Sequence, residues 1–327
     1  MLKRCTLVFA LALSACGGAE VTDGQVDELS LSATPHLLPF GLPDPAARTP
    51  LAHLDYYGGR VLGNVEVVAV LWGSKVNPDI RDGIGNFYSA AVGSTYFDWL
   101  SEYNTDIAAM NGDQGTGQTL GRGSLTGVVT ITPKNKAQKL TDRAIERELA
   151  SQIGSGKLPK PHPDTVYMLS FPPGIQIDLG GAHSCESGGF CAYHSAFKRG
   201  GKAIAYGVLP DFSPGSGCDT GCGGAGRQFD NQTAVASHEL IEAVTDPDVG
   251  LAGKAIGPPI AWYDAQRGEI GDVCNGKHGK LHSKGGKSYV VQKEWSNKAK
   301  ACVVSHGKGG ADAEAQELEL QQAPQGE

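Results

Sequence analysis

The segment of residues 230–247 concentrates side chains that could hold a metal ion. Asp230 can cap the first turn of a helix and Pro247 cannot extend the last one, so the sequence predicts a helix between them. At about 100° per residue, four ionisable residues fall on one arc beside an apolar arc: His238, Glu239, Glu242 and Asp246. The first, third and fourth are spaced at i, i+4 and i+8 along one line. Three carboxylates around one imidazole repel each other unless a cation, a buried proton or a basic side chain compensates. A divalent metal ion is the simplest compensation.

The string of residues 238–246 resembles the active helix of thermolysin-like zinc peptidases. In their HExxH helix, two histidines four residues apart bind zinc, and the intervening glutamate is the general base on the metal-bound water. Glu242 stands here in place of the second histidine. The resemblance implies zinc held by His238 and Glu242, with Glu239 as the catalytic base. The departure leaves open a harder metal preference, or a helix that kept its shape after losing catalysis.

Residues 268–272, Gly-Glu-Ile-Gly-Asp, resemble the segment in which such enzymes place a third, carboxylate ligand and an acidic supporting residue. Glu269 is the predicted third metal ligand, and Asp272 is its supporter or substitute. Asp246 and His194 are assigned supporting positions. Weaker candidates, each expected to be a loop residue with ordinary hydrogen bonds, are His183, His194 and Asp264. The alternative to a metal site is that the polar arc of the helix is a solvated face.

The N-terminal residues are typical of a signal peptide. Two basic residues precede an apolar run at residues 5–13, which is shorter than the roughly 20 apolar residues that span a membrane. Residues 13–16, Leu-Ser-Ala-Cys, resemble a bacterial lipobox, so we predict cleavage after residue 15 and lipidation of Cys16. The alternative is ordinary cleavage after an alanine. Gly17 resembles the sorting signal of outer-membrane lipoproteins, which predicts a protein of the bacterial cell envelope.

The charge of the chain argues against nucleic-acid binding. Removing residues 1–15 takes away two positive charges, so the formal net charge changes from −7 to −9. A chain this acidic offers no electrostatic footprint for nucleic acid or anionic lipid. Its predicted contact with the membrane is the N-terminal lipid alone.

Six cysteines remain after the two near the N-terminus are set aside: Cys185, Cys191, Cys218, Cys222, Cys274 and Cys302. An even number in an oxidising compartment predicts three disulfides. The short separations within 185/191 and within 218/222 favour local pairing and leave 274/302 as the long staple. The alternative joins the first four cysteines in a zinc knot.

The composition divides the chain into four parts. Residues 1–15 are the lipoprotein signal peptide, 16–52 a flexible tether, 53–305 the folded domain and 306–327 a disordered acidic tail. Within the domain, strand-type runs at 65–72, 127–132, 166–171 and 203–209 alternate with helical patterns at 88–103 and 140–153. This alternation predicts a single α/β domain with a mixed β-sheet and packed helices. The glycine-rich stretch 179–226 is expected to form loops stapled by disulfides.

A wider resemblance covers residues 56–302. The matching pieces, in order, are Tyr-Tyr-Gly-Gly-Arg-Val-Leu at 56–62, Phe-Cys-Ala-Tyr-His at 190–194, Cys218 with Cys222, residues 238–242, Trp-Tyr at 262–263, Glu-Ile-Gly-Asp-Val-Cys at 269–274 and Cys302. Together they resemble the EXORDIUM or phosphate-induced protein family, known mostly from plant cell walls and also from bacteria. The resemblance implies one domain and local disulfide pairing. Members are associated with extracellular growth and nutrient responses, and no substrate comes with the family.

Two interpretations of function follow. The first is a zincin-like metallohydrolase, and more narrowly a peptidase, in which residues 166–171 or 203–209 supply an edge strand for an extended extracellular peptide. The second is a non-catalytic envelope protein that binds wall polysaccharide or a partner, with the helix as a structural cation site. In that case aromatic side chains would stack on sugars: Tyr193, Tyr206 and Trp262.

Overall fold

The structure is a computed structural model that describes residues 36–39, 52–253 and 256–306. The predicted signal peptide and Cys16 lie outside the described residues. So do the acidic tail from residue 307 onward and the tether, apart from residues 36–39 and 52.

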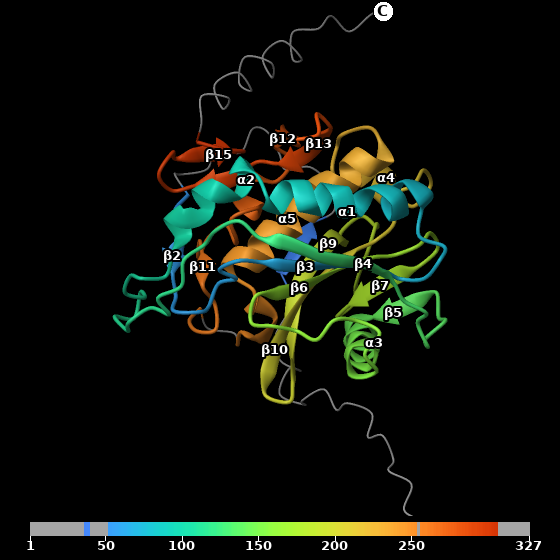
Figure 1. The fold of residues 1–327 in the computed structure, drawn as a ribbon, viewed down its shortest axis with the longest axis horizontal. Coiled ribbons are helices and arrows are strands. Elements are labelled where there is room, and N and C mark those ends of the chain that lie inside the picture. Colours follow the sequence, from blue (N-terminus) through green and yellow to red (C-terminus); the bar gives the residue numbers. More distant parts are fainter. Residues whose placement is uncertain (1–35, 40–51, 254–255, 307–327) are drawn as a thin grey trace, which may run out of the picture.

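A six-stranded mixed sheet forms the centre of the fold (Figure 1). Its order is β1 (His36–Pro39), β9 (Phe190–Arg199), β10 (Lys202–Leu209), β6 (Thr165–Ser170), β3 (Glu66–Leu71) and β4 (Ser124–Thr130). The last four strands are parallel to one another, β9 is antiparallel to β10, and β1 is antiparallel to β9. The predicted α/β class with a mixed sheet and packed helices is confirmed.

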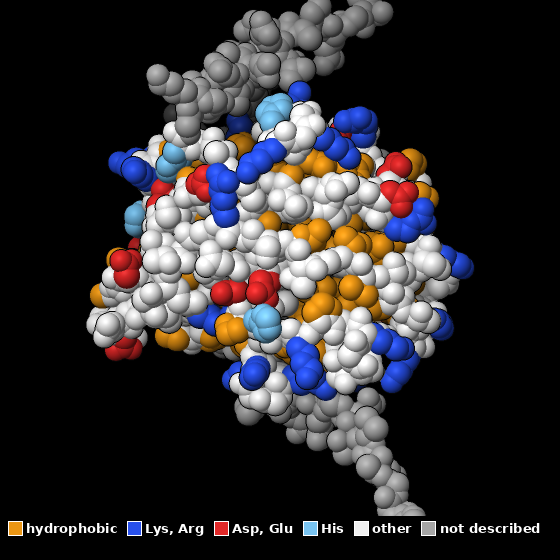
Figure 2. Space-filling model, in the orientation of Figure 1, with side chains coloured by type: hydrophobic (Ala, Val, Ile, Leu, Met, Phe, Trp, Pro, Cys, Tyr) orange, Lys and Arg blue, Asp and Glu red, His pale blue; other side chains and the backbone are white. Residues whose placement is uncertain are grey.

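The predicted edge strands are interior strands. β10 pairs with β9 and β6, and β6 pairs with β10 and β3, so neither can accept another strand. Near-continuous apolar runs belong to strands with both faces covered, and all six residues of β6 are buried. Among the described residues, the sheet ends at β1 and β4. β4 alternates exposed and half-buried residues, and Figure 2 shows apolar side chains gathered over this part of the surface.

Helices cover both faces of the sheet. α1 (Pro78–Val92) and α5 (Gln228–Thr245) lie on one face, and α3 (Asp142–Gly154) lies on the other (Figure 1). The side chains of β3 alternate accordingly. Val67, Ala69 and Leu71 join the core under α1 and α5, whereas Val68 and Val70 join the core under α3.

The predicted helix 88–103 begins earlier and is interrupted. α1 starts at Pro78, where the side chain of Asn77 accepts a hydrogen bond from the backbone N–H of Asp79. Gly83 lies inside this helix, and a side chain there would clash, since a Cβ would come within 2.7 Å of the Phe229 ring. The helix ends at Gly93, and α2 (Thr95–Asp98) and η2 (Trp99–Tyr103) follow it.

Short elements surround this core. One three-stranded sheet is formed by β5 (Lys139–Thr141), β7 (Gln176–Leu179) and β8 (Ala182–His183). Two-stranded sheets are formed by β2 (Asp55–Tyr56) with β11 (Trp262–Tyr263) and by β12 (His278–His282) with β13 (Ser288–Gln292). Another is formed by β14 (Glu294–Ser296) with β15 (Ala301–Val303). The single-turn helices are α4 (Cys218–Gly221), η3 (Val249–Leu251) and η4 (Asp272–Cys274).

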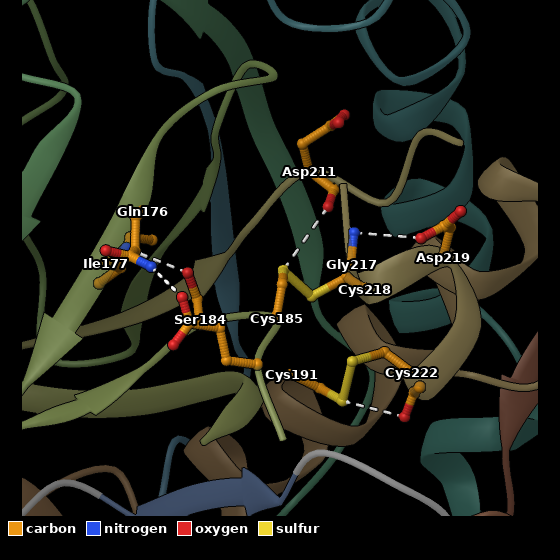
Figure 3. Close-up of a disulfide and its surroundings, with 12 residues drawn as sticks. Gln176, Ile177, Ser184, Cys185, Cys191, Asp211, Gly217, Cys218, Asp219 and Cys222 are labelled. Atoms are coloured by element: carbon orange, nitrogen blue, oxygen red, sulfur yellow. Dashed lines mark hydrogen bonds between the residues drawn. A yellow bond between two sulfur atoms is a disulfide. The ribbon is translucent and has the colours of Figure 1, made fainter. Parts of the chain in front are cut away.

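The expected local disulfides are wrong. Cys185 bonds to Cys218 and Cys191 bonds to Cys222, with Cα–Cα distances of 4.4 and 5.5 Å (Figure 3). Cys218 begins α4 and Cys222 follows its last residue, so the two cysteines flank one helical turn that lies against the β8–β9 connection. Cys218 and Cys222 therefore each bond to a cysteine of residues 185–191, and they do not bond to each other.

The remaining pairing is the one expected. Cys274 bonds to Cys302, as the sequence predicted, with a Cα–Cα distance of 5.7 Å. The zinc knot is contradicted because all four of its sulfurs are oxidised in disulfides. Three disulfides are consistent with an extracytoplasmic location. Within the described ranges, no helix has the length and apolar character needed to cross a membrane.

Candidate metal centre

Helix α5 is buried on every side. All residues from Asp230 to Thr245 are buried, and the helix contacts β9 and β10 of the sheet and β13 on its other side. The alternative in which its polar arc is a solvated face is therefore wrong. The ionisable side chains of α5 point into the interior, where a charge is costly unless it is paired or bound to a metal.

One cluster forms around His238. Its Nε2 lies 3.1 Å from Glu242 Oε2 and 3.9 Å from Asp272 Oδ1. Its Nδ1 lies 2.7 Å from Nε2 of the Gln292 side-chain amide, and its own Nε2 faces the two carboxylates. The backbone N–H of Asp272 donates to Glu242 Oε1, which ties η4 to α5. Asp272, and not Glu269, thus shares the cluster of His238.

A second cluster forms around His194. Its Nδ1 lies 3.4 Å from Glu239 Oε2 and 3.5 Å from Glu242 Oε2, and its Nε2 lies 3.3 Å from Glu269 Oε1. Glu242 therefore belongs to both clusters. His194, Glu242 and Glu269 form one group of possible metal ligands with donor atoms within 4.8 Å, and His238, Glu242 and Asp272 form another.

His194 was underestimated from the sequence. It was expected in a loop, but it lies inside β9 and is fully buried. The glycines and cysteines of residues 179–226 suggested loops, yet Phe190–Phe197 is an aromatic-rich run that is typical of a buried strand. That run was the available signal for β9.

The other predicted residues have ordinary contacts. Asp246 stands at the C-cap of α5, where its carboxylate accepts a hydrogen bond from the backbone N–H of Ala261. His183 pairs with Asp178 at 3.3 Å, and Asp264 pairs with Arg267 at 2.9 Å. Asp264 thus makes the ordinary hydrogen bonds that were expected, whereas His183 lies in β8 and its Nδ1 has no hydrogen bond to the described residues.

Two supporting residues were missed. Gln292 at the end of β13 donates to the Gly271 carbonyl at 2.9 Å and to Glu294 Oε2 at 3.3 Å. Glu294, in β14, also accepts a hydrogen bond from Tyr96 at 3.0 Å. Burial raises the pKa of Glu294 to about 8. No motif marks these residues in the sequence, because strand pairing and not spacing brings them to α5.

Several buried polar atoms of the centre have no hydrogen bond to any part of the chain that the structure describes. They are Nε2 of His238, Nδ1 of His194 and both carboxylate oxygens of Glu239. The two imidazole nitrogens face carboxylate oxygens at 3.1–3.5 Å, so their contacts are ion pairs that lack hydrogen-bond geometry. Three side chains from two elements thus carry polar atoms toward the same buried space without hydrogen bonds.

In the protein without a metal, the pKa values of several ionisable groups in the two clusters differ from their ordinary values. Burial raises the pKa of Glu239 to about 7. Burial also acts to raise the pKa of Glu242, but His238 and His194 outweigh it and hold this pKa well below its ordinary value. Burial acts to lower the pKa of His194, yet Glu269, Glu239 and Glu242 raise it well above the ordinary value. Without a metal, the histidines must supply the positive charge.

The donor set fits a divalent ion. Ligands about 2.0–2.2 Å from a tetrahedral ion lie about 3.4 Å apart, and the two distances from His238 Nε2 bracket that spacing. Imidazole and carboxylate are common zinc ligands. The described residues therefore provide a possible metal site, although no side chain of the two clusters is more than 11% exposed.

Gly271 packs closely against His238 and Glu242, so a substitution at this position tests the metal centre. A Cβ at this position would lie 2.5 Å from His238 Nδ1 and 2.8 Å from Glu242 Oε1. We expect Gly271→Ala to reduce the metal content of the purified protein and to destabilise it by about 1–3 kcal/mol. Gly127→Ala, at a position with no atom within 4 Å of the added Cβ, is the matched control. Equal metal content in both variants would contradict a metal site formed by His238 and Glu242 beside Gly271.

The comparisons with known proteins give a distant relationship. No family model matches the chain, and no solved structure matches it. Protein EXORDIUM-like 5 of Arabidopsis thaliana is 24% identical in an alignment of length 308 that covers 77% of this chain and 77% of the relative. The likeness of residues 238–246 to zinc peptidases remains an interpretation of the motif. The chain is thus distantly similar to an EXORDIUM-like protein, and its described residues include a buried cluster of histidines and carboxylates that could bind a metal ion.

Proposed function

We propose that this chain is a metal-dependent hydrolase, most closely a peptidase, of the bacterial cell envelope. His238, Glu242 and Asp272 would hold the ion, which would polarise the scissile carbonyl as a Lewis acid. One observation carries the proposal. Buried imidazole and carboxylate atoms without hydrogen bonds converge on one space in α5 and its neighbours.

Glu239 would act as the general base. It follows His238 on α5, and neither of its carboxylate oxygens has a hydrogen bond to the described residues. Burial raises the pKa of Glu239 to about 7, and a base is most effective when its pKa lies near the working pH. Glu239 would take a proton from the attacking water and pass it to the leaving amine.

A second candidate function rests on the burial. His194, His238 and Glu239 are 0% exposed, and a catalytic metal needs a coordination position that substrate can reach. A metal ion bound there without access would be structural, and the chain would be a non-catalytic envelope protein. In the hydrolase, the cover over α5 must open before a peptide can bind.

Hydrolysis of a mixed peptide library separates the two functions. The full chain, without a histidine tag, should cleave peptides, lose the activity in a chelator and regain it with Zn²⁺. His238→Ala should lower the rate at least tenfold, whereas the exposed His282→Ala should not. Protein that binds the metal yet cleaves no peptide, before and after chelation, supports the structural site and overturns the hydrolase.

The location in the envelope follows from Cys16. If acyl chains on Cys16 hold the protein at the membrane, Cys16→Ser should move it from the membrane to the soluble fraction, because each buried CH₂ contributes about 0.8 kcal/mol. Fractionation of cells with an antibody against the folded domain measures this. A membrane-bound Cys16→Ser variant would overturn the lipid anchor.

A further inference from the structure

We infer that the centre binds two divalent ions that share Glu242 as a bridging ligand. The inference rests on the proposed metal centre and adds a second ion, at His194 and Glu269, to the one at His238 and Asp272.

The first argument is the position of Glu242. Its Oε2 lies 3.1 Å from His238 Nε2 and 3.5 Å from His194 Nδ1, so one carboxylate oxygen stands between imidazoles from α5 and β9. Each imidazole also has a carboxylate that the other lacks, Asp272 for His238 and Glu269 for His194. Two sets of three ligands therefore meet at one residue.

The second argument is the unsatisfied nitrogen on the side of His194. The His194 ring is fully buried, and its Nδ1 has no hydrogen bond although it faces Glu239 and Glu242. An ion between His238 and Asp272 alone would leave this nitrogen as it is, whereas an ion held by His194, Glu242 and Glu269 would engage it.

The third argument is charge. Four carboxylates surround the two rings: Glu239, Glu242, Glu269 and Asp272. If both imidazoles are neutral, the four carboxylates carry four negative charges. Two divalent ions would balance these charges, whereas one ion would balance only half of them. Uncompensated charge is costly in a buried site.

A pair of ions would place the proposed activity among the hydrolases that use two metal ions. Metal pairs about 3.5–4 Å apart occur in aminopeptidases and phosphatases, where they would orient the attacking water and stabilise the negative charge that develops on the substrate. A carboxylate that bridges the pair sets this separation.

Metal stoichiometry tests the inference. The untagged full chain, equilibrated with Zn²⁺ and freed of excess metal, should carry two ions per chain by elemental analysis and native mass spectrometry. His194→Ala and Asp272→Asn should each halve that number, because each removes a ligand of one site. Glu242→Gln should lose both ions. Glu148→Gln, a buried glutamate of α3 on the other face of the sheet, should keep both.

The outcomes separate the two proposals. One ion per chain, unchanged in His194→Ala, overturns the second site and leaves the proposed function intact. No bound ion in the wild-type chain overturns both. If His194→Ala fails to fold, electron paramagnetic resonance of the Mn²⁺-loaded wild type decides. A spin-coupled pair supports the bridge, and isolated Mn²⁺ contradicts it.

Discussion

Glu239→Gln should lower the rate of peptide hydrolysis by about 10²- to 10⁴-fold, the usual cost of losing a general base. The amide has the shape of the carboxylate but cannot take the proton from the attacking water. Glu239 does not belong to either group of possible metal ligands, so the metal content should not change. The measurement is kcat under saturating substrate, with metal analysis of the same preparation.

The matched control is Glu148→Gln. Glu148 is also a buried glutamate, but it lies on α3, where it accepts hydrogen bonds from the backbone of Lys134 and from Gln152. Its replacement should leave the rate unchanged. A Glu239→Gln variant that turns over at the wild-type rate would exclude Glu239 as the base. One that loses its metal would make Glu239 a ligand instead.

Removing the metal should lower the free energy of unfolding by about 4 kcal/mol if the free ion was present at 1,000 times its dissociation constant. A ligand that binds only the folded state stabilises it by mass action. Its loss would also leave Glu239 and Glu242 buried together, with only the histidines to oppose them. For a domain of this size the melting temperature should fall by about 8–16 °C. Calorimetry with and without a chelator measures the difference.

Glu242→Gln should remove this sensitivity to the chelator, because it takes a ligand from both candidate groups. Its melting temperature should be the same with and without chelator. Glu148→Gln should retain the full shift. A wild-type chain whose melting temperature does not respond to chelator, with a metal content no higher than that of Glu242→Gln, would contradict a stabilising metal centre.

The sequence was informative where the interactions are local. The predicted bounds of α5 fell within two residues of the observed ones, Gln228–Thr245, and the spacing of His238 and Glu242 put both on one face. The predicted cap was wrong, because the N-cap is Arg227 and Asp230 lies in the first turn. Thr141 caps α3 one residue after its predicted start. Such signals need only the geometry of one helix, so they can be found without tertiary structure.

The errors arose where distant segments meet. Asp272 and Glu269 are three residues apart in the sequence, but Asp272 lies near His238 and Glu269 lies near His194. This difference depends on how η4 packs against α5. His194 reaches the centre because β9 lies next to β10 in the sheet under α5, which no local pattern states. The disulfides likewise follow from α4 lying across the β8–β9 connection (Figure 3). Sequence distance misled in each case because packing decides which neighbours meet.

The most direct test of the metal centre is an anomalous difference map, recorded at the zinc absorption edge from crystals of the untagged full chain grown with Zn²⁺. We predict a peak about 2.0–2.2 Å from both His238 Nε2 and Glu242 Oε2. A map without a peak at these atoms, with His238 and Glu242 in direct contact as an ion pair, would contradict the account.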